Sequence, residues 1–101
     1  MIRQELSKAT LLNYGMKQSK VLKILGEPIK SEFTKDFEEW HYCTTGQNVD
    51  QFIALFFHKN KLVATTNYTT DASDGGPGDC SIFIKRGDYR EPDTVKELKT
   101  K

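Results

Sequence analysis

The sequence is poor in the residues that build metal centres and disulfide frameworks. Among its 101 residues are two cysteines, Cys43 and Cys80, and two histidines, His41 and His58. Two cysteines are too few to define a disulfide framework or a zinc site, and whether they pair with each other stays open. His41 and Cys43 could share one strand face, but no third or fourth ligand has a recognisable spacing. We therefore expect no metal and no cofactor.

Long apolar runs and a signal peptide are also missing. No apolar run approaches the roughly 20 residues that span a bilayer, so we expect no membrane anchor in this chain. The first residues, MIRQELSKAT, carry charges where a signal peptide would carry its apolar segment. As written, the sequence predicts a cytoplasmic protein. If Met1 replaces a removed leader, the alternative is the periplasm.

The charge is nearly balanced, which argues against nucleic acid as a partner. The formal net charge is +1, although residues 1–30 hold six basic and two acidic side chains while residues 31–79 hold three basic and eight acidic ones. Binding to a phosphate backbone needs a clustered basic stripe interleaved with aromatic residues, which this distribution does not provide. The uneven distribution can still orient a partner.

The patterns that could indicate catalysis are weak. Asp36, Glu38 and Glu39 crowd one predicted turn, whereas an acid/base pair needs two carboxylates in contrasting environments. The glycine-rich segment DASDGGPGD, residues 71–79, lacks the lysine and the following helix of a phosphate-binding loop. A nucleophile formed by Cys43 and a histidine would also need an oxyanion hole, which the sequence does not indicate. We predict no catalytic residue.

What the sequence does contain is two helical segments followed by a change of hydrophobic period. Residues 3–12 and 17–25 repeat their apolar side chains at helical spacing, and lysines gather on the opposite side of the second segment. Gly26 can take the left-handed conformation after the last turn, and Pro28 forbids continuation. From residue 29 onward the period is that of strands.

Four segments alternate with a period of two and predict antiparallel strands joined by short turns. They are residues 29–35, 38–44, 51–58 and 62–70. KDFEE is expected to form the first turn, and Asn60 can accept the positive φ of the last one. Trp40 and Tyr42 share one strand face and are expected in the core.

The expected fold is α+β: two short N-terminal helices packed on an antiparallel β-meander of three to four strands, with a C-terminal extension. We expect one domain over residues 1–101, with its core in residues 3–70. The extension comprises the glycine-rich loop 71–79 and an extra strand and tail over 80–101, in which a helix could begin at Pro92.

The helix and its caps carry a resemblance to a known family. The pattern G-M-x-Q-x-x-V-x-x-x-L-G-x-P runs from Gly15 to Pro28, and W-x-Y follows at Trp40 and Tyr42 before a hairpin. It resembles the SmpA/OmlA domain family, which includes the BamE outer-membrane assembly lipoproteins, over roughly residues 9–70. The resemblance implies two helices packed on one face of a three-stranded sheet.

Three features depart from the family pattern. Lys17 stands where the family often has a threonine, and a lysine cannot accept the hydrogen bond that caps a helix. The lipobox and its acylated cysteine are absent, so that route of membrane anchoring is not carried over. Residues 71–101 have no counterpart that we can place in the family.

The resemblance implies a non-enzymatic module for protein–protein interaction, because members of the family act by docking a surface. Both alternate sets of residues 51–58 are apolar while two short helices can cover one face, so we expect the other face to bind a partner protein or a second copy in a homodimer. The candidate interaction residues are Phe52, Phe56, Phe57, Tyr89 and Arg90. The alternative is a small-ligand-binding protein or minor enzyme with a pocket between the sheet and residues 71–90.

Overall fold

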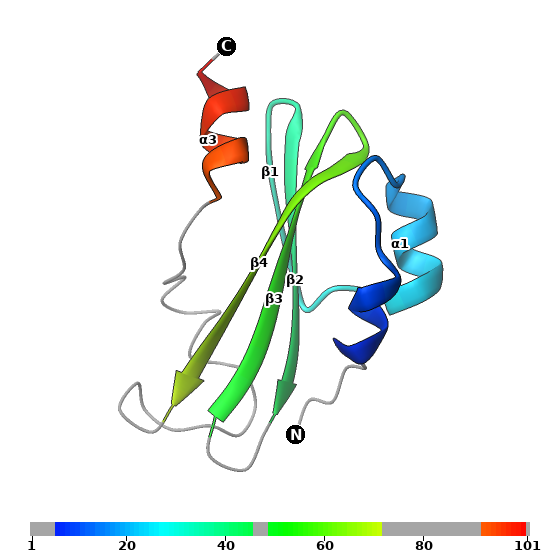
Figure 1. The fold of residues 1–101 in the computed structure, drawn as a ribbon, viewed down its shortest axis with the longest axis vertical. Helices are drawn as coiled ribbons and strands as arrows, with labels where there is room; N and C mark the ends of the chain where they lie inside the picture. The colour runs from blue at the N-terminus through cyan, green and yellow to red at the C-terminus, as the bar shows by residue number, and fades with distance from the viewer. Residues whose placement is uncertain (1–5, 46–48, 72–91, 101) are drawn as a thin grey trace.

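The structure is a computed structural model and describes residues 6–45, 49–71 and 92–100. A 3-10 helix and an α-helix precede four strands, and a further helix lies near the C-terminus (Figure 1). The bounds are η1 Leu6–Leu11, α1 Gln18–Leu25, β1 Lys30–Thr34, β2 Phe37–Thr45, β3 Val49–His58, β4 Lys61–Asp71 and α3 Asp93–Lys99. Within the described ranges, no helix is both long and apolar enough to cross a membrane.

The strands form one antiparallel sheet in the order β1-β2-β3-β4, which confirms the predicted meander. Lys35 and Asp36 form the first turn, which is shorter than predicted because β2 already pairs with β1 from Phe37. Lys59 and Asn60 form the turn between β3 and β4, and Asn60 has the predicted positive φ, 70°. Such short turns keep sequential strands adjacent in the sheet.

α1 covers one face of the sheet with the predicted phase. Val21 is fully buried, while Lys20 and Lys23 face solvent. Ala9 and Leu12, from η1 and the link after it, pack against the same cluster. We call this side the α1 face. Its buried side chains are Val21, Trp40, Tyr42, Ile53, Leu55, Phe57 and Leu62.

Both ends of α1 are held by other elements. Lys17 at the N-cap makes no side-chain capping bond, and Asn60 Oδ1 accepts a hydrogen bond from the Gln18 N–H at 3.3 Å. At the other end, Gly26 has φ 82° and ψ −164°, a region essentially restricted to glycine but different from the left-handed helical one. The Tyr42 hydroxyl donates to the Gly26 carbonyl oxygen at 2.7 Å.

Trp40 and Tyr42 are core residues, as predicted from their shared register. Their exposed fractions are 6% and 0%. The Trp40 Nε1–H donates to Glu38 Oε2 at 2.6 Å, so both rings bury their apolar bodies and keep a partner for their polar atoms. Burial, and secondarily the Glu27 carboxylate, raises the pKa of the Tyr42 hydroxyl above its ordinary range.

The placement of the helices corrects the prediction that two N-terminal helices pack together on the sheet. The first segment is a 3-10 helix in its described part, Leu6–Leu11. α3 begins after Pro92, as the sequence predicts, and buries Val95 against the opposite side of the sheet, which we call the α3 face. Because β3 is apolar on both sides, each side needs a cover. Val95 clusters there with Ala54, Phe56 and Ala64.

The predicted loop over 71–79 and the predicted strand over 80–86 lie outside the described residues, apart from Asp71, which ends β4. The division of the chain into a core and an extension stays a prediction.

Candidate functional site

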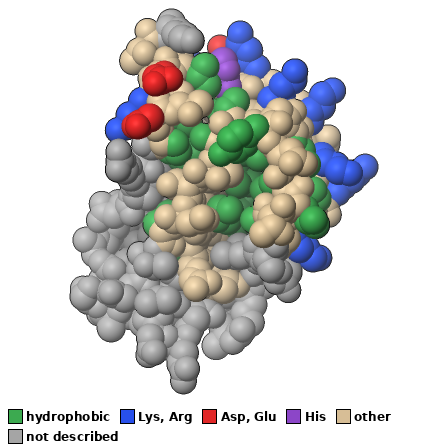
Figure 2. Space-filling model, in the orientation of Figure 1, with side chains coloured by type: hydrophobic (Ala, Val, Ile, Leu, Met, Phe, Trp, Pro, Cys, Tyr) green, Lys and Arg blue, Asp and Glu red, His purple; other side chains and the backbone are tan. Residues whose placement is uncertain are grey.

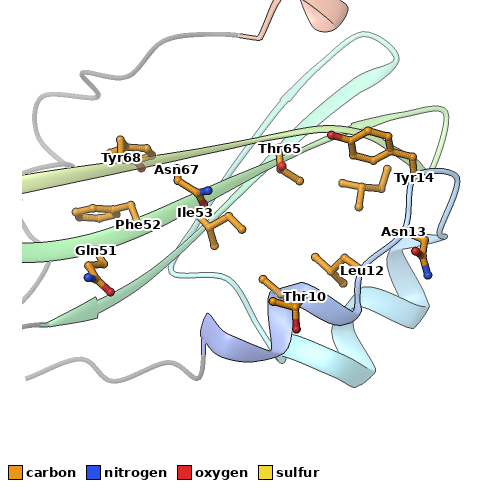
Figure 3. Close-up of a pocket in the computed structure, with 12 residues that line it drawn as sticks. Thr10, Leu12, Asn13, Tyr14, Gln51, Phe52, Ile53, Thr65, Asn67 and Tyr68 are labelled. Carbon is orange, nitrogen blue, oxygen red and sulfur yellow. The ribbon is translucent and has the colours of Figure 1, made fainter.

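A groove opens between the segment after η1 and the strands β3 and β4 (Figure 3). Its volume is about 910 Å³, within the size range of sites that hold ligands or peptide segments. The residues that line it are Ala9, Thr10, Leu12, Asn13, Tyr14, Gln51, Phe52, Ile53, Leu62, Thr65, Asn67 and Tyr68.

Backbone hydrogen bonds fix the N-terminal wall of this groove to the start of β4. The Gly15 N–H donates to the Leu62 carbonyl oxygen at 2.7 Å, and the Leu62 N–H donates to the Met16 carbonyl oxygen at 2.9 Å. Gly15 has φ 90°, a value that residues with a side chain rarely adopt. These bonds hold the segment between η1 and α1 beside Leu62. Residues 10–14 therefore form one wall of the groove, and β4 forms the other (Figure 3).

The floor of the groove is apolar and its walls are polar but uncharged. Leu12 packs on the core cluster that contains Ile53 and Leu62. The polar side chains that line the walls are Thr10, Asn13, Gln51, Thr65 and Asn67. Amides and hydroxyls can both donate and accept hydrogen bonds, so they can match the backbone of a bound segment.

One aromatic ring, that of Tyr14, lies at an end of the groove (Figure 3). Tyr14 is 69% exposed at one end. Phe52 and Tyr68 border the other end, but the sheet register places their rings on the α3 face, where they stack with ring centroids 4.8 Å apart and an angle of 6° between the ring planes. The Tyr68 hydroxyl lies 3.0 Å from His41 Nδ1, which fixes the ring in place. An exposed aromatic side chain such as Tyr14 can anchor a protein interface.

The described lining of the groove carries no formal charge. Its lining residues include no carboxylate, amine, imidazole or thiol among the described side chains. General acid–base catalysis most often uses a histidine, a carboxylate or a lysine, and none of these lines the groove among the described residues. An apolar floor with uncharged polar walls instead favours recognition of a chain segment.

The structure places three of the five sequence-predicted interaction residues away from the surface. Phe52, Phe56 and Phe57 are 2%, 1% and 0% exposed. The expected exposure of one alternate set is therefore wrong. α1 packs over Phe57, α3 packs in the cluster of Phe56, and Phe52 is buried among Cys43, Ile29 and Tyr68. A role for the three residues in an interface stays a prediction, although Phe52 does border the groove. Tyr89 and Arg90 lie outside the described residues.

Sequence reasoning missed the groove, although β4 carries a signal for it. Thr65 and Asn67 occupy alternate positions on the α1 face, opposite the apolar Leu55 and Ile53 of β3. Polar residues on a face that is otherwise core indicate that the cover stops there. The link that forms the opposite wall gives no comparable signal.

His41 and Cys43 share the α3 face, as predicted, but do not form a metal site. His41 is fully buried, with Nδ1 near the Tyr68 hydroxyl and Nε2 at 3.3 Å from Glu39 Oε2. Cys43 is disulfide-bonded, and the other cysteine of the sequence, Cys80, lies outside the described residues. In the described part of the chain, no group of three or more histidine, cysteine or acidic residues could hold a metal ion.

His58, the second histidine, stacks on Phe37 with ring centroids 4.5 Å apart and an interplanar angle of 24°. It therefore packs beside a turn and lies apart from His41 in the sheet register, where Phe37 pairs with His58 and Ala54 with His41.

Comparison with known families agrees with the fold and with the helix motif. The model of the outer membrane protein assembly factor BamE domain matches residues 5–67, which is more than half of the chain. The match contains η1, α1, the three strands β1–β3 and most of β4. A comparison with curated protein sequences gives no match. The resemblance drawn from the helix and its caps is thus confirmed, and the chain belongs to the BamE domain family, the SmpA/OmlA-like family of outer-membrane protein assembly factors.

Proposed function

We propose that this protein is a non-enzymatic accessory module of outer-membrane protein assembly, which binds a partner protein in the groove between residues 10–14 and β4. The observation that carries the proposal is the lining of the groove, with an apolar floor, uncharged polar walls and the exposed Tyr14 ring at one end. Membership of the BamE domain family supports it, since that family is one of assembly factors.

The groove replaces the flat sheet surface as the proposed site of contact. The sequence predicts a partner protein or a second copy on a sheet face that the two N-terminal helices cannot cover. Both alternate sets of β3 are buried within one chain, so the described residues provide no exposed apolar sheet face that would drive dimerisation. A partner of different sequence is therefore the occupant that we propose.

The disulfide at Cys43 supports a location in the periplasm. Disulfides persist in oxidising compartments, including the bacterial periplasm, and are rare in the cytoplasm. Outer-membrane assembly factors act on the periplasmic side of that membrane, so the family and the disulfide favour the same compartment. We propose the periplasmic alternative in place of the cytoplasmic one.

The alternative function, a small-ligand site or minor enzyme between the sheet and residues 71–90, stays a prediction. Nearly all of the segment that would form one wall of that pocket lies outside the described residues. The groove offers no ionisable group with an ordinary pKa near neutrality, so it gives this alternative no support as an enzyme.

Site-specific photocrosslinking in the native host tests the proposal. A photoreactive residue at Asn67, an exposed position in the groove, should crosslink to a protein of the outer-membrane assembly machinery. The same residue at Glu97, an exposed position on α3, is the control and should give no such product. Equal crosslinking from both positions, or none from Asn67, would overturn the groove as the site.

A further inference from the structure

A second surface lies at the end of the sheet where both hairpin turns meet the start of α1. The Gln18 N–H bond to Asn60 holds α1 against the β3–β4 turn, and an isolated β-bridge joins Lys17 to Lys61. A hollow of about 310 Å³ opens there. The residues that line it are Gln18, Phe33, Lys35, Asp36, Glu38, Phe57, Lys59 and Asn60.

The exposed lysines around this end of the sheet are Lys17, Lys35, Lys59 and Lys61. We call the surface formed by these four lysines and Phe33 the basic end. Figure 2 shows lysine side chains gathered along the upper right of the molecule. Lys30 forms an ion pair with Glu32 at 2.9 Å, whereas none of the four lysines forms an ion pair with a described carboxylate.

Local stability alone does not favour lysine at these positions. Lys35 and Lys59 have φ 52° and 51°, in turns where glycine, asparagine or aspartate is preferred. Lys17 opposes the dipole of α1 at its N-cap and faces Lys61 across the bridge, where like charges repel. Residues that go against the conformational preferences of their turn or helix cap are often kept for a function.

Phe33 adds an apolar anchor to this charged surface. It is 72% exposed, although it pairs with Glu38 on the same side of the sheet that α1 covers further along. Its ring borders the 310 Å³ hollow together with Lys35 and Lys59. An exposed aromatic side chain ringed by charges matches the arrangement of binding hot spots, in which an apolar anchor sits within a polar rim.

We propose that the basic end docks an acidic segment of a partner protein, whose carboxylates approach the lysines while one apolar side chain packs against Phe33. Charge complementarity requires that the bound segment of the partner be negatively charged. The hollow is also lined by Asp36 and Glu38. Their carboxylates would repel the phosphates of a bilayer or of a nucleic acid, which are negatively charged throughout. A protein segment can place an apolar residue there instead.

The carboxylate of Glu38 is already engaged inside the protein. Gln18 Nε2 donates to its Oε1 at 3.0 Å and Trp40 Nε1 to its Oε2 at 2.6 Å. It therefore competes little for the lysines. This docking surface is separate from the groove, and it does not depend on the function proposed for the groove.

Titration with designed peptides tests the inference on the whole chain. The probes are a fluorescent glutamate-rich peptide with one central leucine and the same peptide with serine in place of leucine. The wild type should prefer the leucine peptide about fivefold, and Phe33→Ser should abolish this preference. Lys35→Asn/Lys59→Asn should weaken binding about tenfold while raising the unfolding temperature, because asparagine tolerates positive φ.

The matched control is Lys8→Gln/Lys96→Gln, which removes the same charge from two exposed lysines elsewhere and should change binding less than twofold. If this control loses as much affinity as the turn variant does, the effect comes from the net charge of the protein and not from the basic end. That result would overturn the inference. Vesicles of phosphatidylcholine with phosphatidylglycerol form a second arm. If they bind the wild type and lose binding in the turn variant as the peptide does, the surface recognises membrane anions, and the proposed protein partner is wrong.

Discussion

The two faces of the sheet are both apolar, yet they are closed in different ways. On the α1 face, large rings fill the space under the helix, and Tyr42 also bonds the carbonyl oxygen of Gly26 after the last turn of α1. On the α3 face, the small side chains of Ala54 and Ala64 lie under Val95. The comparison teaches that a hydrogen bond joins α1 to the sheet on one face. On the α3 face the side-chain hydrogen bonds of His41 with Tyr68 and Glu39 lie within the sheet, and α3 packs on it through Val95.

The difference also explains where binding surfaces can form. η1 and α1 cover only part of the α1 face, so the groove remains beside β4 and the hollow remains beside Phe33. Both proposed contact surfaces thus lie at the margins of one helix layer, where apolar floor and polar rim meet.

The largest effects should come from removing one ring on each face. Phe56→Ser and Phe57→Ser should each lower the free energy of unfolding by about 3–5 kcal/mol, because both rings are buried within one chain. Denaturant melts and mass in solution should show two destabilised monomers. A Phe56→Ser variant that stays stable and changes only its mass would mean that the α3 face is an interface between chains.

The next effect concerns the packing of α1. Leu25→Ala should cost about 2 kcal/mol, since this half-buried side chain packs on the cluster of the α1 face. Lys23→Ala, on the exposed side of the same helix, is the control and should change the free energy of unfolding by less than about 0.5 kcal/mol. Equal effects in denaturant melts would show that the helix has a different phase.

A smaller effect should follow from removing the hydroxyl that locks α1 to the sheet. Tyr42→Phe should cost about 1–2 kcal/mol near pH 7, because the Gly26 carbonyl oxygen loses its donor.

The same variant has a predicted pH signature. The pKa of Tyr42 is raised in the folded state, so the unfolded chain releases the proton first and wild-type stability falls as pH rises above about 10. Below that pH the contribution is fully present. Tyr42→Phe should show a shallower loss of stability in alkaline melts, and a slope identical to that of the wild type would contradict the account.

The smallest expected effect is a gain at the start of α1. Lys17→Thr should raise the free energy of unfolding by about 0.5–1 kcal/mol, since a threonine oxygen can cap the helix and the repulsion with Lys61 disappears. Asn60→Ala, which removes the acceptor for the Gln18 N–H, should act in the opposite direction. A destabilised Lys17→Thr variant would reveal a structural role for the lysine.

Most of the fold could be predicted from the sequence because its signals are local. Gly26 and Pro28 end α1, the period of two marks the strands, and Asn60 fits a turn with positive φ. The cover of the α3 face could not be predicted in this way. It depends on Val95, which lies far along the chain from Ala54 and whose short helix has only a weak pattern of its own.

The site was harder to predict for a related physical reason. The apolar character of Phe56 and Phe57 says that both are buried by something, but it does not say whether by the same chain or by another. The groove depends on where the link at Tyr14 stands relative to Asn67, and this follows from the backbone bonds between Gly15 and Leu62. Such long-range pairing leaves no local signature.

The central claim is that the groove binds a protein of the outer-membrane assembly machinery, and a binding titration with those purified proteins tests it most directly. Asn13→Asp/Asn67→Asp places two carboxylates at exposed positions of the uncharged walls and should weaken binding by about tenfold or more without unfolding the chain. Thr94→Asp/Thr100→Asp makes the same change of charge at exposed positions on and after α3 and should bind as the wild type does. Undiminished binding by the folded groove variant would contradict the account.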